Sequence, residues 1–337
     1  LDHTCPSPDL RANSKEKRVN IWKRRFKVAA LVAVASVSLV ACANDTGTTD
    51  STGSDSSSAA AMGPVRISGQ SWSEAALMAS MYEQVLADMG FQPEVKLVDT
   101  RDVYMQTFPG EVDVVPEYVG GVVDFLNTTV NGADAPSLTT SDAAESLANA
   151  STLFADKGIT MLAPSEATDT NAFFVSQKYS DENGGLTKLS QLKGKKVVLA
   201  AAPDCEGRAD CSGGLSGDYG IKVTDILPLG FASDATYQAV IDGEAQLGLT
   251  STTDGTLASQ GLVLLEDDLK IQPAQNLVPA VSSAFLTSHP DVQPRLFFFI
   301  DTPTTEKLTE LNGRISVDRE LPETVAKDFL VSEGLIG

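Results

Sequence analysis

The chain has 337 residues, with 45 Asp and Glu against 25 Lys and Arg, so its formal net charge at pH 7 is −20. Apolar residues make up 42% and charged residues 21%, which is an ordinary globular composition with enough chain for two cores. The acidic excess argues against nucleic-acid binding, which needs a basic surface to neutralise phosphates. Four Cys are too few for a disulfide-framed scaffold, and two His leave little material for His-based metal or catalytic chemistry.

The first 41 residues have the pattern of an export signal. Residues 11–27 hold a dense cluster of Lys and Arg, and the uncharged run 28–41 that follows is shorter than the about 20 apolar residues that span a bilayer. A basic region before a short apolar run is typical of a secretory signal. The run ends at Cys42 in the sequence Leu-Val-Ala-Cys, which resembles the lipobox of bacterial lipoproteins. There the Cys thiol receives a diacylglycerol, and cleavage makes the Cys the first residue. A non-cleaved anchor helix and a chance Cys are the alternatives.

Residues 42–63 are rich in Ser, Thr, Gly and Asp and contain no aromatic residue. Such a segment cannot bury enough apolar surface to fold, so we expect a flexible tether. A lipid on Cys42, a tether and an acidic body predict a protein anchored to the outer face of the bacterial cytoplasmic membrane, because two acyl chains are enough for stable anchoring.

The body then alternates strands and helices. Its first part predicts strands at 65–68, 95–98, 112–115 and 159–162, and helices at 73–89, 101–108 and 142–157. Ser73 is predicted to cap the first helix and Gly90 to end it. This order indicates an α/β domain with a largely parallel sheet.

A second series of the same kind follows. Strands are predicted at 173–176, 196–202, 225–229, 247–250 and 262–265, helices at 188–192 and 234–241, an extended segment at 277–281 and helices from 290 onward. The length fits two lobes: residues 64–168 with 282–337, and residues 169–281. The chain would cross between them near 167–172 and 276–282, which makes the cleft between the lobes the expected ligand site.

Several stretches, in order along the chain, resemble one family. They are 71–74 (Ser-Trp-Ser-Glu), 110–120 (Gly-Glu-Val-Asp-Val-Val-Pro-Glu-Tyr-Val-Gly), 237–243 (Tyr-Gln-Ala-Val-Ile-Asp-Gly), 252–255 (Thr-Thr-Asp-Gly), 264–268 (Leu-Leu-Glu-Asp-Asp) and 311–312 (Leu-Asn). The set resembles the substrate-binding proteins of ABC importers for glycine betaine, choline and related osmoprotectants. The resemblance implies a type II periplasmic-binding-protein fold, with two Rossmann-like lobes joined by two crossing strands. It also implies a small-molecule solute and an importer permease as partners, and no cofactor; we expect a monomer.

The resemblance also implies a ligand box. A quaternary ammonium has no N–H donor, so aromatic faces hold it by cation–π contact and dispersion, while an Arg can clamp a betaine carboxylate. Tyr118 and Tyr237 match aromatic positions of the family, and Arg208 matches its carboxylate-binding Arg. Asn171 stands where members of the family often have Tyr, and Ser251 where some members have an aromatic residue, so a larger or more hydroxylated ligand is an open alternative.

Trp72, Thr253 and Asp254 complete the predicted ligand residues, because they lie on loops within the matched motifs. Each aromatic candidate could instead be a core residue. Arg208 could simply pair with acidic neighbours, and Asp254 could cap the turn that follows it. The sequence leaves these alternatives open.

Cys205 and Cys211 lie six positions apart in a Gly-rich loop. Outside the cytoplasm a disulfide is the default state of such a pair, and a metal site is the alternative, although no His or second Cys pair accompanies it. The bond would close the loop that carries Arg208 and hold that side chain in place.

Other functions are weaker alternatives. Beyond the signal segment His289 is the only His, which argues against Ser-His or Cys-His nucleophilic chemistry, so we expect no enzyme activity and no metal. A surface lipoprotein without a transported ligand is a second alternative. A third keeps the transport role but changes the ligand to an amino acid, a polyamine or an aromatic solute.

Overall fold

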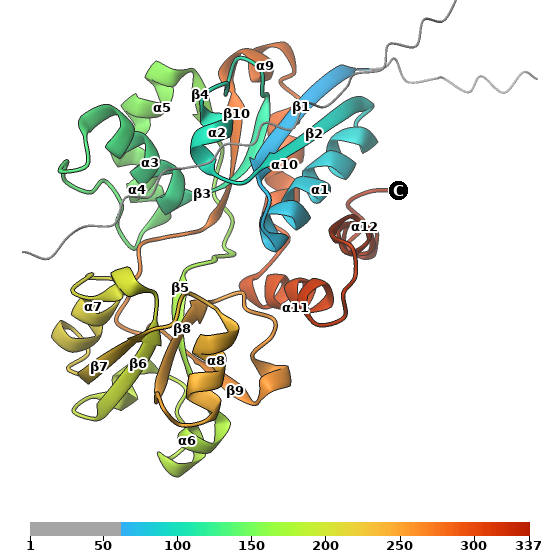
Figure 1. The fold of residues 1–337 in the computed structure, drawn as a ribbon. Helices are drawn as coiled ribbons and strands as arrows, with labels where there is room; N and C mark the ends of the chain where they lie inside the picture. The colour runs from blue at the N-terminus through green and yellow to red at the C-terminus, as the bar shows by residue number, and fades with distance from the viewer. Residues whose placement is uncertain (1–61) are drawn as a thin grey trace, which may run out of the picture. The chain divides into compact units, whose positions relative to one another are not determined.

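The computed structural model describes residues 62–337, which contain two five-stranded sheets with their accompanying helices (Figure 1). The predicted signal segment, Cys42 and the tether up to residue 61 lie outside the described residues. The first strand begins at Gly63, where the predicted tether ends. Within residues 62–337, no helix is both long enough and apolar enough to cross a membrane.

The first sheet has the strand order β2-β1-β3-β10-β4. Its strands are β1 (Gly63–Gln70), β2 (Phe91–Val98), β3 (Val114–Tyr118), β4 (Ile159–Met161) and β10 (Leu277–Ser282). β1 runs parallel to β2 and β3, whereas β10 runs antiparallel to both β3 and β4. The sheet is therefore mixed, and the expected parallel pairing holds only for its first three strands.

The second sheet repeats this pattern with the order β7-β6-β8-β5-β9. Its strands are β5 (Asn171–Ser176), β6 (Lys196–Ala201), β7 (Lys222–Pro228), β8 (Leu247–Ser251) and β9 (Leu262–Leu265). β6 runs parallel to β7 and β8, and β5 runs antiparallel to β8 and β9. Each sheet thus has one reversed strand at the same place in its order.

The reversed strands, β5 and β10, are those that the chain enters directly after crossing between the lobes. The two crossing segments lie antiparallel, with a bridge between Thr168 and Asn276 and a 3.1 Å hydrogen bond from the Asp169 amide to the Gln275 carbonyl. Because β10 pairs within the first sheet, we propose that the second lobe ends at Asn276 rather than at residue 281.

Nine helices accompany the first sheet in the described part of the chain. They are α1 (Ser73–Asp88), α2 (Arg101–Met105), α3 (Val119–Asn131), α4 (Ala143–Asn149), α5 (Ser151–Lys157), α9 (Ser283–Ser288), α10 (Val292–Ile300), α11 (Thr305–Ser316) and α12 (Pro322–Ser332). α1 buries Leu77, Met81 and Val85 completely, one turn after another, and packs beside α12 (Figure 1). The N-cap of α1 is Trp72 rather than Ser73, and its side chain makes no capping hydrogen bond.

Helix α3, which begins directly after Tyr118, was not predicted from the sequence. Its buried residues Val119, Val122, Val123 and Leu126 follow helical spacing, so the pattern was present. Gly120 and Gly121 concealed it, because Gly in a helix costs up to about 1 kcal/mol relative to Ala. The glycines have a structural role: a Cβ at Gly120 would lie 2.8 Å from the Ala274 carbonyl oxygen, next to the crossing segment.

The second lobe contains α6 (Gln177–Glu182), α7 (Ser212–Gly217) and α8 (Asp234–Ile241), with 3₁₀ turns at Leu189–Leu192, Pro203–Cys205 and Ala258–Gln260. α8 was predicted with its observed bounds, whereas α6 and α7 are only six residues long and were missed. Two apolar clusters form the core of this lobe. In one of them, the buried ring of Phe174 lies against the backbone of Gly248 in β8.

We predict that Gly248→Ala destabilises the second lobe. The added Cβ would lie well inside van der Waals distance of the Phe174 ring, so the ring must move within a packed core, at a cost of about 1–3 kcal/mol. Gly217→Ala in α7 is the matched control, because a Cβ there meets nothing within 4 Å. Urea unfolding of the two variants should show a lowered midpoint for Gly248→Ala alone; an unchanged midpoint would contradict the close approach.

Candidate functional site

A cavity of 360 Å³ is lined by residues of both lobes. The first lobe contributes the start of α1 and the end of α11, and the second contributes the loop before α8, α8 itself and the turn after β8. Four predicted ligand residues, Trp72, Tyr237, Thr253 and Asp254, line it together. The fold therefore gathers residues from motifs that are far apart in the sequence at one place between the lobes.

Trp72 supplies the exposed aromatic surface of this cavity. Its side chain is held at the N-cap of α1 and is 40% exposed. Behind it lies Tyr118, the last residue of β3, with the two ring centroids 5.4 Å apart and the planes tilted by 30°. Tyr118 is buried in the apolar cluster of the first lobe and does not line the cavity itself. It supports the indole, while Trp72 presents a face to the cavity.

Glu74 is a buried carboxyl group that the sequence analysis did not assign a role. It accepts hydrogen bonds from the Tyr118 hydroxyl at 2.7 Å and from Asn312 Nδ2 at 2.5 Å. Asn312 Nδ2 also donates to the Thr253 carbonyl across the lobes at 3.1 Å. Burial raises the pKa of Glu74, although these donors oppose the shift. Its position in the Ser-Trp-Ser-Glu motif was the available signal.

Asp169, in the first crossing segment, is a second acid that was missed. Its Oδ1 accepts a hydrogen bond from Thr253 Oγ1 at 2.9 Å. Burial and the nearby Glu74 raise the pKa of Asp169 to about 7. Thr253 thus contacts the crossing segment through its hydroxyl and α11 through its carbonyl, so one residue of the second lobe joins three parts of the site.

Asp254 organises the turn after β8. One carboxylate oxygen accepts the Tyr237 hydroxyl at 2.6 Å and the Thr250 hydroxyl at 2.5 Å, and the other accepts the amide and hydroxyl of Thr256 at 2.9 and 2.7 Å. Burial, together with Asp254, raises the pKa of Tyr237 to about 12. The Tyr237 ring is therefore held in one orientation at the cavity wall.

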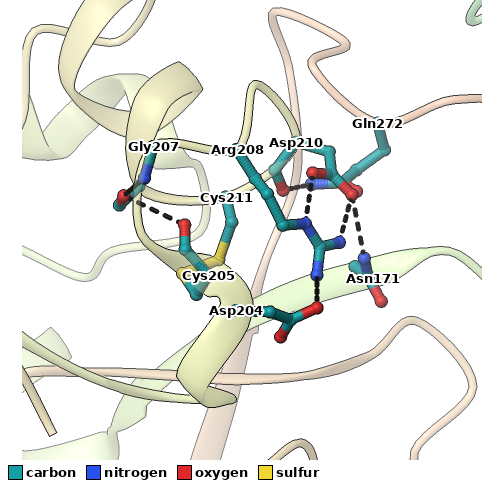
Figure 2. Close-up of a disulfide and its surroundings, with 9 residues drawn as sticks. Asn171, Asp204, Cys205, Gly207, Arg208, Asp210, Cys211 and Gln272 are labelled. Carbon is teal, nitrogen blue, oxygen red and sulfur yellow. Dashed lines mark hydrogen bonds and ion pairs between the residues drawn. A yellow bond between two sulfur atoms is a disulfide. The ribbon is translucent and has the colours of Figure 1, made fainter. Parts of the chain in front are cut away.

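Arg208 and Asn171 lie outside this cavity, in a cluster around Asp210 (Figure 2). Arg208 donates from Nε and Nη2 to Asp210 at 2.9 and 2.6 Å, and from Nη1 to Asp204 at 2.9 Å. Asn171 Nδ2 reaches the same Asp210 carboxylate at 3.3 Å. Both guanidinium edges are thus occupied by acidic neighbours, as expected if Arg208 only pairs with them, and ligand binding by Arg208 stays a prediction.

The predicted disulfide between Cys205 and Cys211 is confirmed. It closes the loop that carries Arg208 (Figure 2), and both Cys residues are buried in the core of the second lobe. A loop this short limits the entropic gain of the cross-link to about 2 kcal/mol. Among residues 62–337 no group of three His, Cys, Asp or Glu is arranged to hold a metal ion.

A buried ion pair stabilises the end of β3. Arg101 donates from Nε and Nη2 to the two Glu117 oxygens, each at 3.0 Å, and Tyr104 donates its hydroxyl to the same carboxylate. Glu117 also accepts the backbone amide of Tyr118 at 3.2 Å. A Cβ at Gly121 would lie 2.6 Å from Arg101 Nη2, so the second glycine of α3 makes room for the guanidinium. The pair fixes the backbone from which Tyr118 reaches Trp72.

A second cavity, of 580 Å³, lies along β5 and β9 beside the start of α11. Asn171 lines it, together with apolar side chains that include Leu257 and Leu262. The turn at Asp254 and Gly255 borders both cavities. A Cβ at Gly255 would collide with the Gly313 amide nitrogen, so the turn can approach α11 this closely only because residue 255 is a glycine.

We predict that Asp169→Asn changes how stability depends on pH. The folded-state pKa of Asp169 is raised above the ordinary carboxyl value of about 4. Its contribution to the free energy of unfolding is therefore fully present below pH 4 and is lost as pH rises through about 7. The amide cannot ionise, so the variant should gain stability relative to wild type between about pH 5 and about pH 8, by at most about 1.4 kcal/mol per pH unit. Urea unfolding at both pH values measures this, with exposed Asp218→Asn as the control. Parallel pH profiles for Asp169→Asn and wild type would contradict the raised pKa.

Comparison with known proteins identifies the family. The model of the OpuAC family, described as the substrate binding domain of ABC-type glycine betaine transport systems, matches residues 63–332. The chain is 26% identical over 287 residues to a glycine-betaine-binding protein of Pseudomonas aeruginosa, covering 81% of this chain and 88% of that one. It is 27% identical over 291 residues to the glycine betaine-binding protein YehZ of Escherichia coli, covering 81% and 92%.

Solved structures agree with the fold. Apo YehZ from Escherichia coli matches with a TM-score of 0.66 at 25% identity, over 81% of this chain and 99% of that one. A glycine betaine/carnitine/choline ABC transporter structure matches with a TM-score of 0.69 at 19% identity, over 81% and 98%. The predicted type II two-lobed fold is confirmed, as is the expectation of a transport protein rather than an enzyme. The chain therefore belongs to the OpuAC family of substrate-binding domains of ABC-type glycine betaine transport systems.

Proposed function

We propose that the protein is an extracytoplasmic lipoprotein that captures a small quaternary-ammonium osmoprotectant, such as glycine betaine or choline, between its lobes and delivers it to an ABC-importer permease. The observation that carries the proposal is the inter-lobe cavity with an exposed indole, a tyrosine and three carboxyl groups, those of Glu74, Asp234 and Asp254, in its walls.

The chemistry of the cavity supports a cation. A quaternary ammonium cannot donate a hydrogen bond, so it gains from aromatic faces and from nearby negative charge. The indole of Trp72 is available for such contact, and Tyr118 and the α1 N-cap hold it in place. Tyr237 adds a second aromatic wall, which Asp254 orients. Because the side chains of Trp72 and Tyr237 are already held in place, they lose little conformational freedom when a ligand binds.

The polar neighbours of these aromatics leave room for other ligands. Ser251, where some related proteins carry an aromatic residue, lines this cavity, and it is paired across β5 and β8 with Asn171, which lies outside the cavity. A hydroxylated solute, an amino acid or a polyamine would find more polar partners here than in an all-aromatic box. Calorimetric measurement of binding to a panel of such solutes and of betaines would distinguish between these ligands.

Capture and delivery by one protein require it to stay near the permease. Cys42 and the segment 43–61 lie outside the described residues, and their roles rest on the lipobox-like sequence and its polar composition. We propose a diacylated Cys42 and a tether that leaves the two lobes free to exchange ligand with the permease. The protein would act as a monomer on the outer face of the cytoplasmic membrane.

Truncation of Trp72 tests the aromatic wall. In the purified protein, Trp72→Ala should weaken binding of glycine betaine or choline by about 5–30-fold, because a cation–π contact contributes about 1–2 kcal/mol. Trp72→Phe should lose less, since it keeps an aromatic face, and Tyr118→Ala should also weaken binding by releasing the indole. Calorimetry gives the affinities, and Phe298→Ala is the control because the Phe298 side chain lies exposed on α10. Wild-type affinity in a folded Trp72→Ala protein would show that Trp72 does not contact the ligand.

Substitution of Cys42 tests the anchor. Cys42→Ala removes the thiol that would carry the diacylglycerol, so the protein should lose the lipid label and be shed or retained as an uncleaved precursor. Metabolic labelling with a lipid precursor and membrane fractionation measure both effects, and Cys5→Ala serves as the matched control because it removes a thiol outside the lipobox-like sequence. A Cys42→Ala protein that still carries the label would overturn the lipoprotein proposal.

A further inference from the structure

Arg319 differs from the other arginines in the described part of the chain. Five of the six arginines in residues 62–337 form ion pairs with Asp or Glu: Arg66, Arg101, Arg208, Arg295 and Arg314. The side chain of Arg319 forms no hydrogen bond or ion pair with any residue in that range. Arg319 is an exposed residue, so a ligand can reach its guanidinium group without displacing a carboxylate.

The position of Arg319 connects it to the ligand site. The residue lies in the turn between α11 and α12 and lines the same inter-lobe cavity as Trp72 and Tyr237. Asn312 and Ser316 of α11 line the cavity as well, so this wall leads from the buried Glu74 contact to Arg319. Arg208, the arginine predicted to bind a ligand carboxylate, does not line this cavity.

The backbone at Arg319 favours a different residue. Its φ of +63° is in the left-handed region, where Gly is preferred and a long side chain is strained. Other helix ends in this chain follow that preference, with Gly90 after α1, Gly158 after α5 and Gly334 after α12 at positive φ. A glycine at this turn would avoid the strain, so the backbone conformation does not account for an arginine at position 319.

We infer that Arg319 binds the carboxylate of a zwitterionic ligand whose quaternary ammonium group lies against Trp72 and Tyr237. The inference rests on the proposed function and names its ligand class as a betaine rather than a cationic alcohol. The cavity contains groups of both charges: Glu74, Asp234 and Asp254 supply carboxyl groups, and Arg319 is the only positive group among its lining residues. A guanidinium fork matches a carboxylate in a bidentate geometry.

A purely structural role for Arg319 predicts different behaviour. The C-terminus of α11 carries partial negative charge, which a nearby cation stabilises whether or not a ligand is bound. In that case, removal of the side chain would change the stability of the protein and would leave its affinity for each ligand unchanged. Binding of a carboxylate predicts a loss of affinity that depends on whether the ligand has that group.

The test compares glycine betaine and choline, two quaternary ammonium compounds of which only the first has a carboxylate. Arg319→Gly removes the guanidinium and suits the left-handed backbone, and Arg319→Gln keeps side-chain bulk without charge. Lys270→Gly is the matched control, because Lys270 also has a positive φ, of +58°, and does not line the cavity. Calorimetry on the purified protein gives each affinity, and melting curves report folding.

Arg319→Gly and Arg319→Gln should each weaken glycine betaine binding by about 10–100-fold and leave choline binding unchanged, while Lys270→Gly alters neither. Arg319→Gly should melt at the wild-type temperature or above it. Equal affinities for glycine betaine in wild type and a folded Arg319 variant, or equal losses for both ligands, would overturn the assignment and leave the proposed function standing. If neither ligand binds the wild-type protein, the proposed function itself fails.

Discussion

The candidate ligand site depends on the hydrogen bonds to the buried carboxyl group of Glu74. It accepts hydrogen bonds from the Tyr118 hydroxyl at the end of β3 and from the Asn312 amide on α11, although these residues lie 44 and 238 positions away. A carboxyl group loses its hydration on burial, so it is tolerated only where such donors replace the water. Those two bonds fix the start of α1, and with it the N-cap at which Trp72 is displayed.

The same cluster joins the two lobes. Asn312 also donates to the Thr253 carbonyl, and the Thr253 hydroxyl donates to Asp169 in the crossing segment. A change in the angle between the lobes therefore has to alter hydrogen bonds to groups whose pKa values are raised by burial. Thr253 is thus the residue of the second lobe that contacts both Asp169 and Asn312, the hydrogen-bond partner of Glu74.

The distribution of arginines follows from the acidic composition. Most guanidinium groups in residues 62–337 are neutralised by carboxylates, including that of Arg208, whose loop is closed by the Cys205–Cys211 disulfide. A paired guanidinium has few donors left for a solute, whereas the unpaired Arg319 retains all of them. Arginine, the residue type that suits carboxylate binding, thus occurs in both lobes. The neighbouring carboxylates determine which arginine has hydrogen-bond donors left for a ligand.

The sequence by itself determined most of the elements and the family. Helical spacing of apolar residues predicted α1 and α8, short apolar runs predicted most strands, and the motifs around Trp72, Tyr118, Tyr237 and Asp254 indicated the substrate-binding family, because all of these are local patterns along the chain. Helix α3 escaped detection only through Gly120 and Gly121. The tertiary structure alone decided the reversal of β5 and β10, the burial of Glu74 and Asp169, and the pairing of Arg208. These depend on where distant segments meet, and neither hydration nor charge pairing can be read from residues that become neighbours only when the chain folds.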